Sequence, residues 1–285
     1  MSSAKLLSNP FAMPAILNTI VTTTSTSPIG VFDSGVGGIS VLKHIHTLLP
    51  NEDLIYVADS KFAPYGNKTQ EFIQERALWI ADFLIARGAK ALVVACNTAT
   101  AAAVDLLRQT YHLPIIAMEP AVKPAAAASK TGVIGVLATS GTLKSAQFAA
   151  LLEHYGQQVE VVTQACHGLV ECVERGELDS QATQDLLASY VQPLMHAGAD
   201  SIVLGCTHYP FLKPLIEKLV GNRSVLIDTG AAVAKELKRR SEEAGLLNGS
   251  DQLGNVSFWS NSIDPNAEEI MMRLWGKQAD FAAIN

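Results

Sequence analysis

The sequence predicts an α/β protein made of two similar domains, each a doubly wound parallel sheet. Strand and helix patterns alternate along the chain. Most of the strand candidates are short apolar runs without alternating polar residues, as expected when helices cover both faces of a sheet. Two segments 110 residues apart are near-copies: GAKALVVACNT from Gly88 and GADSIVLGCTH from Gly198. This repetition predicts two equivalent halves.

The individual elements follow from these patterns. The predicted strands are residues 29–32, 54–58, 91–95, 115–118, 132–137, 159–163, 201–205 and 225–227. The predicted helices are residues 39–48, 69–87, 99–110, 143–155, 180–195, 211–220 and 231–244. Thr142 and Ser180 are residue types that begin helices, and Gly156, Gly198 and Gly245 indicate helix ends.

A second repeat indicates where the halves begin. The tripeptide IGV starts at Ile29 and again at Ile134, 105 residues later, and a turn of small residues follows each copy. We therefore predict a first domain from residue 29 to 121 and a second from 122 to 228, with the Pro- and Ala-rich stretch 120–128 as the crossing. Residues 1–28 are predicted to be a flexible or regulatory extension, because prolines interrupt the apolar part and hydroxyl residues fill positions 22–27.

Composition excludes several classes of protein. A chain of 285 residues can form two domains with sizeable cores. Its net charge of −6 and the lack of a basic stripe argue against a nucleic-acid partner. No uninterrupted apolar stretch is long enough to span a bilayer, so no membrane role is expected. Four cysteines do not make a disulfide scaffold in a chain of this length, and free thiols predict a reducing compartment, the cytoplasm.

The two repeated cysteines are the main functional candidates. Cys96 and Cys206 each follow a buried strand and precede a helical pattern, at the sheet edge where open α/β folds bind ligands. A helix start can lower a thiol pKa from about 8.5 toward neutrality, which favours the reactive thiolate. Polar neighbours flank both sulfurs: Asn97, Thr98, Thr207 and His208. One such cysteine alone would more often be an inert core residue, but the duplication favours a function.

Other sulfur and imidazole groups are weaker candidates. Cys166 and Cys172 lack such a setting and are interpreted as structural. Zinc could use Cys96, Cys206, His208 and His167, but the C-x-x-C and H-x-x-x-H spacings of common sites are missing. We therefore predict no metal.

Two turns offer groups for a small amino acid. The turn DSGVGG at residues 33–38 lacks the lysine and spacing of a phosphate loop. Its N–H groups and Ser34 suit a carboxylate, and Asp33 suits an ammonium group, although Asp33 could simply cap the next helix. Further along, Tyr65 and Gly66 could donate to a small acid, although their segment could equally be an ordinary β-turn.

Five segments together resemble the cofactor-independent amino-acid racemases, in particular the bacterial glutamate racemases. They are GVFDSGVGG at 30–38, ADS at 58–60, PYG at 64–66, ACNTA at 95–99 and GCTHYP at 205–210. The resemblance spans roughly residues 29–275. It implies two flavodoxin-like domains with the active site in the cleft between them, and a tail, 229–285, that returns to the first domain. It also implies glutamate racemisation that supplies D-glutamate for peptidoglycan, without a cofactor.

The resemblance also assigns roles to residues. It implies that Cys96 is the base that acts on D-glutamate, assisted by Asp33, and that Cys206 is the base that acts on L-glutamate, assisted by His208. Two opposed acid–base groups suit racemisation, because a proton must leave one face of the α-carbon and arrive at the other. The implied substrate-holding residues are Asp33, Ser34, Tyr65, Gly66, Asn97, Thr98, Thr139, Thr142, Thr207 and His208. Asp59 and Glu174 match further acidic positions with secondary roles.

Alternatives and departures remain at this point. Aspartate racemases share the two cysteines, but they usually carry an acidic residue where this chain has His208. A thiol-based redox or binding protein on the same fold predicts a disulfide between Cys96 and Cys206. The family often has proline where this chain has His167, a departure in the loop that precedes Glu174. Some relatives with a long N-terminal extension are activated by UDP-MurNAc-L-alanine, which we carry as a hypothesis, and a homodimer is left open.

Overall fold

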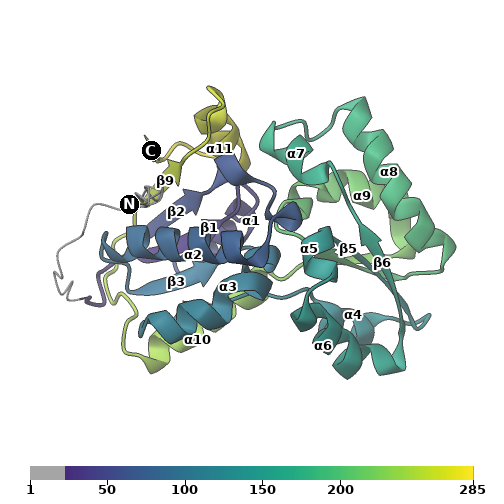
Figure 1. The fold of residues 1–285 in the computed structure, drawn as a ribbon, viewed down its shortest axis with the longest axis horizontal. Helices are drawn as coiled ribbons and strands as arrows, with labels where there is room; N and C mark the ends of the chain where they lie inside the picture. The colour runs from purple at the N-terminus through teal and green to yellow at the C-terminus, as the bar shows by residue number, and fades with distance from the viewer. Residues whose placement is uncertain (1–22, 285) are drawn as a thin grey trace, which may run out of the picture.

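The computed structural model describes residues 23–284, and its helices and strands alternate along most of the chain (Figure 1). Its strands are β1 (Ile29–Asp33), β2 (Leu54–Ala58), β3 (Ala91–Val94), β4 (Ile115–Ile116), β5 (Val133–Ala138), β6 (Glu160–Ala165), β7 (Ser201–Gly205), β8 (Val225–Ile227), β9 (Val256–Ser260) and β10 (Asp280–Ala283). Its helices are α1 (Ile39–Leu48), α2 (Gln70–Ile85), α3 (Asn97–Thr110), α4 (Val122–Ala128), α5 (Ser140–Leu143), α6 (Ala146–Tyr155), α7 (Leu169–Glu174), α8 (Gln181–His196), α9 (Lys213–Val220), α10 (Gly230–Glu243) and α11 (Ala267–Trp275).

The strands form two parallel sheets of related topology. The first sheet has six strands in the order β10-β9-β2-β1-β3-β4, and the second has four in the order β6-β5-β7-β8. The second order repeats the β2-β1-β3-β4 portion of the first. In each sheet the order in which strands are added reverses beside the first strand, β1 or β5. This point is the topological switch point, where such folds bind ligands. The predicted α/β class and the half-repeat are confirmed.

Helices cover both faces of each sheet, which explains the continuous apolar strands. In the first sheet, α1 packs with α10 and α11, while α2 packs with α3 (Figure 1). In the second, α8 packs with α9, and α4 packs with α6. Every residue of β1 and β7 is buried as a result. Gly88 and Gly198, the equivalent glycines of the repeat, both have φ near +85° (84° and 85°), a conformation that glycine adopts without strain.

The predicted helix over residues 143–155 is wrong in its details. Two helices occupy this region, α5 and α6, and Thr142 lies inside α5 rather than before it. The N-caps are Thr139, whose hydroxyl accepts from Thr142 N, and Ser145, whose hydroxyl accepts from Phe148 N. Because Ser145 also bonds the carbonyl of Thr142, it ends one helix while it starts the next. Ser180 caps α8, as predicted.

Other elements were not predicted. The stretch proposed as the crossing contains α4, which packs on the second sheet, so the chain crosses before residue 122. The sequence patterns also missed α7, α11, β9 and β10. Strand β9 pairs with β2, and β10 pairs with β9, so the C-terminal segment extends the first sheet. The proposed boundaries at residues 121–122 and 228–229 therefore leave one sheet in each domain.

The end of the N-terminal extension lies against the first domain. Lys90 N donates to Pro28 O at 2.9 Å, and the buried Lys90 ammonium bonds both Ser25 O and Glu52. Residues 1–22 of the proposed extension lie outside the described residues. Across residues 23–284, the structure contains no helix with the length and apolarity that crossing a membrane requires.

Candidate active site

A cavity between the two domains holds both repeated cysteines. It lies at the carboxyl ends of the strands, and residues of both domains line it: Ser34, Pro64, Tyr65, Gly66, Cys96, Asn97, Thr98, Thr139, Val170, Gly205, Cys206, Thr207 and His208. Its volume of about 10 Å³ is room for roughly one water molecule. The two thiols that the sequence placed in equivalent halves therefore meet in one enclosed space.

Not every predicted site residue lines this cavity. Asp33, Asp59, Thr142 and Glu174 lie behind its wall and contact lining residues instead. Conversely, Pro64, Val170 and Gly205 line it without having been predicted. Pro64 and Gly205 adjoin the quoted motifs and could have been included on that ground. Val170 carries no polar group, so no sequence signal pointed to it.

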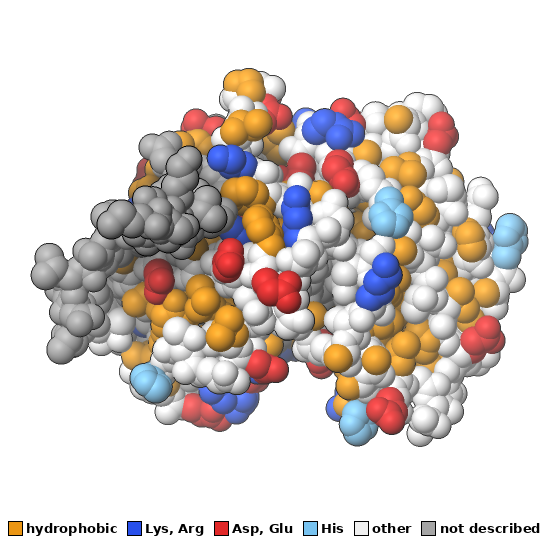
Figure 2. Space-filling view, viewed as in Figure 1, with side chains coloured by type: hydrophobic (Ala, Val, Ile, Leu, Met, Phe, Trp, Pro, Cys, Tyr) orange, Lys and Arg blue, Asp and Glu red, His pale blue; other side chains and the backbone are white. Residues whose placement is uncertain are grey.

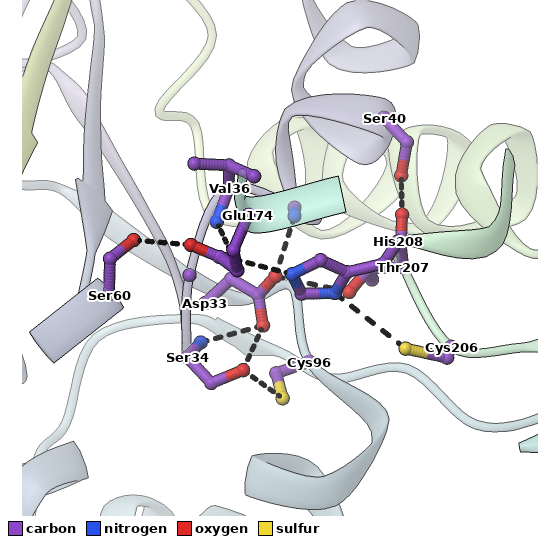
Figure 3. Close-up of polar contacts among 12 residues, drawn as sticks. Asp33, Ser34, Val36, Ser40, Ser60, Cys96, Glu174, Cys206, Thr207 and His208 are labelled. Carbon is purple, nitrogen blue, oxygen red and sulfur yellow. Dashed lines mark hydrogen bonds and ion pairs between the residues drawn. The ribbon is translucent and has the colours of Figure 1, made fainter. Parts of the chain in front are cut away.

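Cys96 sits in an acidic and hydroxyl-rich setting. It is the N-cap of α3, and its sulfur accepts from Ala99 N at 3.4 Å. The thiol donates to Ser34 Oγ at 3.7 Å, and Ser34 Oγ donates to Asp33 Oδ1 at 3.2 Å (Figure 3). Burial and the Asp33 charge raise the pKa of Cys96 well above its usual value, whereas the bond from Ala99 opposes them. This direction is opposite to the lowered pKa expected for Cys96, and it favours the protonated thiol.

Asp33 anchors the glycine-rich turn instead of facing the cavity. Its fully buried carboxylate accepts from Ser34 N and Gly38 N at 2.6 Å each, and from Thr207 Oγ1 of the second domain at 3.1 Å. Gly38 is the N-cap of α1, and no side chain caps this helix, so Asp33 is not its cap but binds the backbone N–H of the cap residue. Burial raises the pKa of Asp33, while the nearby His208 lowers it. The contact of Asp33 with a substrate ammonium group stays a prediction, since Asp33 does not line the cavity in this arrangement.

Cys206 sits beside a histidine and a carboxylate. Its sulfur lies 3.7 Å from His208 Nδ1, and His208 Nε2 lies 2.6 Å from Glu174 Oε1 (Figure 3). Burial alone would lower the pKa of His208, but its bonds to Cys206 and Glu174, together with their charges, raise that pKa well above the usual value. An imidazolium donates from both nitrogens, so this histidine can stabilise a thiolate on Cys206.

The hydroxyl of Tyr65 points to a buried carboxylate. It donates to Asp59 Oδ2, and the same carboxylate receives Arg76 in a bidentate ion pair at 2.7 and 3.0 Å. Asn261, in the returning C-terminal segment, donates to Asp59 Oδ1 at 2.6 Å. The expected donation from Tyr65 to a substrate is therefore replaced by a bond that fixes the position of the Tyr65–Gly66 segment.

Further polar groups line the cavity or join the domains. Within residues 23–284, neither polar atom of the buried Asn97 amide has a hydrogen-bond partner. A buried amide without partners is costly, so this one is available to a ligand. The hydroxyls of Thr98, Thr139 and Thr142 form a cluster with distances of 2.9 to 3.2 Å, which links the first domain to the second.

The metal and disulfide alternatives each need particular side chains to lie together in residues 23–284. No group of three or more His, Cys, Asp or Glu side chains there could hold a metal ion. His167 lines a neighbouring cavity of about 260 Å³ and lies 3.2 Å from Ser140 Oγ. All four cysteines, which fall within the described part of the chain, are free thiols. The disulfide expected of a redox protein is therefore not formed.

The fold and the cavity define a two-domain α/β protein in which each domain supplies one thiol to a shared cavity. Residues 29–237 match the model of the Asp/Glu/hydantoin racemase family, and the chain belongs to this family. It is 56% identical to the glutamate racemase of Ectopseudomonas mendocina over 90% of this chain and 97% of the relative. It is 57% identical to that of Pseudomonas syringae over 86% and 89%, respectively.

Solved structures agree with this assignment. Glutamate racemase RacE1 of Bacillus anthracis superposes with a TM-score of 0.83 at 32% identity, over 92% of this chain and 98% of the other. The Escherichia coli glutamate racemase, solved with L-glutamate and the activator UDP-MurNAc-ala, gives a TM-score of 0.81 at 29% identity, over 90% and 98%. The family resemblance drawn from the five motifs is confirmed.

Proposed function

We propose that this protein is a glutamate racemase that interconverts L- and D-glutamate by two-base proton transfer between Cys96, Cys206 and the α-carbon. The observation that carries the proposal is the single cavity lined by both thiols, one from each domain. More than half of the residues in matched segments are identical in relatives named glutamate racemase, which supports glutamate as the substrate. We further propose that the enzyme is cytoplasmic and supplies D-glutamate for peptidoglycan.

The settings of the two thiols suggest how a cycle begins. Cys206 as the thiolate, next to the His208 imidazolium, removes the α-proton of L-glutamate. Cys96 as the thiol then donates its proton to the opposite face, which leaves D-glutamate, a Cys206 thiol and a Cys96 thiolate. The reverse reaction starts from that second state. In each turnover one sulfur gains a proton and the other loses one, so the two sulfurs together carry one proton before and after the reaction. The proton transfers therefore balance without a cofactor.

The α-proton is far less acidic than a thiol, so the site must also stabilise the carbanionic transition state. Buried donors that are fixed before the reaction do this best, because they need no reorganisation. The unpartnered amide of Asn97 and the hydroxyls of Ser34, Thr98, Thr139 and Thr207 line the cavity and suit this role. We assign Asp33, Asp59, Thr142 and Glu174 to positioning these groups, since they contact lining residues from behind.

The cavity also constrains how substrate binds. A volume of about 10 Å³ cannot hold glutamate, whereas it suits a site closed around one water molecule. We therefore propose that the cleft widens to admit glutamate and narrows again for catalysis. Closure would exclude water and strengthen each electrostatic contact within the site.

The test is racemisation by the purified protein, followed by circular dichroism with L-glutamate, D-glutamate, L-aspartate and D-aspartate. We expect both glutamate enantiomers to approach the same racemic end point, and aspartate to react about 10-fold more slowly or worse, because one methylene is worth that much in a fitted site. No racemisation of glutamate, or faster racemisation of aspartate, would overturn the assignment.

A second part of the proposal concerns activation by UDP-MurNAc-L-alanine, a ligand present in the Escherichia coli structure. We propose that the N-terminal extension takes part in this response. The intact chain should be more active with the precursor, and a chain without residues 1–24 should show equally low activity with and without it. An intact chain that is fully active without the precursor would refute this part alone.

A further inference from the structure

Glu174 receives donors from both domains on one carboxylate. It ends α7 in the second domain, and its side chain is 15% exposed. Oε1 accepts from Val36 N of the first domain at 2.7 Å, and Oε2 accepts from Ser60 Oγ, also of the first domain, at 2.8 Å. The third partner is His208 Nε2, at 2.6 Å from Oε1. Figure 3 shows the carboxylate between these three groups.

The glycine-rich turn is shaped to receive this pair of side chains. A Cβ atom on Gly35 would lie 1.9 Å from Glu174 Oε1, and one on Gly37 would lie 2.2 Å from His208 Nδ1. Both distances are too short for any side chain. Glu174 and His208 of the second domain therefore fit into the first domain only because positions 35 and 37 carry no side chain. Gly35 and Gly37 therefore have a steric role, in addition to the hydrogen bonds that the backbone N–H groups of this turn can donate.

The same contacts bear on the charge of the His208–Glu174 pair. Burying an ion pair costs free energy unless further hydrogen bonds satisfy the carboxylate. Glu174 and His208 belong to one domain and can pair whether or not the cleft is closed. Val36 N and Ser60 Oγ belong to the first domain, so closure of the cleft is what brings these two donors to the Glu174 carboxylate.

We propose that Glu174 is a positioning residue and a closure latch: its docking on Val36 and Ser60 holds the domains together and keeps His208 aligned on Cys206. The part of this inference that concerns Cys206 rests on the proposed racemase function. It goes further than that function because it makes the alignment of His208 on Cys206 depend on contact between the domains. It also assigns a function to Ser60, which does not line the cavity.

Isotope effects separate this role from a general loss of structure. For a reaction with equal end points, kcat/KM must be the same in both directions, so rates alone cannot show which thiol is impaired. A defect on the Cys206 side makes its proton transfer more rate-limiting. The primary deuterium isotope effect on kcat/KM should then rise with L-[2-²H]glutamate and fall with D-[2-²H]glutamate. A merely damaged fold would lower kcat/KM without moving the two values in opposite directions.

Three variants test the latch. Glu174→Gln preserves the shape but removes the charge, and should lower kcat/KM about 10- to 100-fold with the opposed isotope shifts. Glu174→Asp keeps the charge but is shorter by one methylene, and should recover only part of the loss. Ser60→Ala leaves the His208 pair intact, and should produce the same opposed shifts at about 3- to 10-fold in kcat/KM. Ser189→Ala, a serine that bonds within its own helix, is the control.

A second readout does not depend on turnover. Cys96 is only 5% exposed, so iodoacetamide should reach it mainly when the cleft opens. We expect alkylation of Cys96 to be several-fold faster in Ser60→Ala than in the parent or in Ser189→Ala. Unchanged alkylation and unchanged isotope effects in Ser60→Ala would overturn the latch, even if Glu174→Gln failed to fold. An inactive parent protein would refute the racemase proposal, and alkylation would still decide the latch.

Discussion

The two thiols occupy equivalent positions of a repeated fold, yet their surroundings differ in charge. Cys96 is followed by neutral residues, and the Asp33 carboxylate is linked to it through Ser34. Cys206 is followed within two residues by His208, which is held by Glu174. A carboxylate disfavours a neighbouring thiolate, whereas an imidazolium favours it.

The different surroundings of the two thiols show which features the duplicated fold determines and which it does not. The repeated strand and helix start deliver a sulfur to each side of the cavity. The residues around each sulfur then make the two sides unequal, because a carboxylate lies behind Cys96 and a histidine–glutamate pair lies beside Cys206.

The largest expected effect tests the equivalence of the two sulfurs. Cys96→Ala and Cys206→Ala should each reduce racemisation by about 10²- to 10⁴-fold, because each removes one of the two acid–base groups. Circular dichroism of the fold and racemisation assays would be measured together. Cys166→Ala is the matched control, since this buried thiol lies outside the cavity between the domains. Strong activity in either single variant would contradict a two-base mechanism.

The next effect sharpens the asymmetry between the two sides. His208→Asn removes a charge-assisted bond to Cys206 and should lower kcat/KM about 10- to 100-fold. Ser34→Ala removes only a neutral bond to Cys96 and should lower it about 3- to 10-fold. Steady-state kinetics with D-glutamate would measure both. Equal losses would mean that the two sides depend equally on their neighbours.

The pH dependence of stability should report the same asymmetry. The pKa of His208 is raised in the folded protein, so protonation of this residue favours folding. This contribution is fully present below the unfolded pKa, about 6.5, and is lost as the pH rises through the higher folded value. Urea unfolding across the range from slightly acidic to alkaline pH should show this loss in the parent and a smaller one in His208→Asn. A pH profile that His208→Asn leaves unchanged would place the titration elsewhere.

The smallest effect concerns the contact that both domains share. Thr142→Val removes one hydroxyl from the Thr98–Thr139–Thr142 cluster but keeps the shape of the side chain. We expect the free energy of unfolding to fall by about 1 kcal/mol, with racemisation within a few-fold of the parent. Urea unfolding and the racemisation assay measure the two quantities. A loss of racemisation comparable to that of His208→Asn would show that the cluster contributes directly to the chemistry.

The sequence predicted the parts of the molecule that depend on local patterns. Buried strands such as β7 and the equivalent cysteines were visible because apolar runs and repeats are written directly in the chain. The same runs placed both thiols at the carboxyl edges of their sheets. The bounds of β2, β7 and β8 agree with the prediction, and those of the other five predicted strands differ by one or two residues, which is the ordinary uncertainty of element ends.

What was missed depends on contacts between distant segments. Strand β9 exists because it pairs with β2, roughly 200 residues earlier, and α7 is too short for a clear helical period. The position of Asp33 behind the cavity and the bond from Tyr65 to Asp59 are also tertiary facts. Burial likewise reversed the expected direction of the Cys96 pKa, and burial cannot be read from a motif.

Figure 2 adds one observation on the surface. Lys and Arg side chains on this face are dispersed among acidic ones and form no continuous patch.

The most direct test of paired thiols on opposite faces is ¹H NMR of either glutamate enantiomer during its first turnovers in D₂O. With two bases, the product should appear with deuterium at the α-carbon, while the remaining substrate keeps its original proton. A product that carries the substrate's own proton would mean that a single group serves both faces, and would contradict the account.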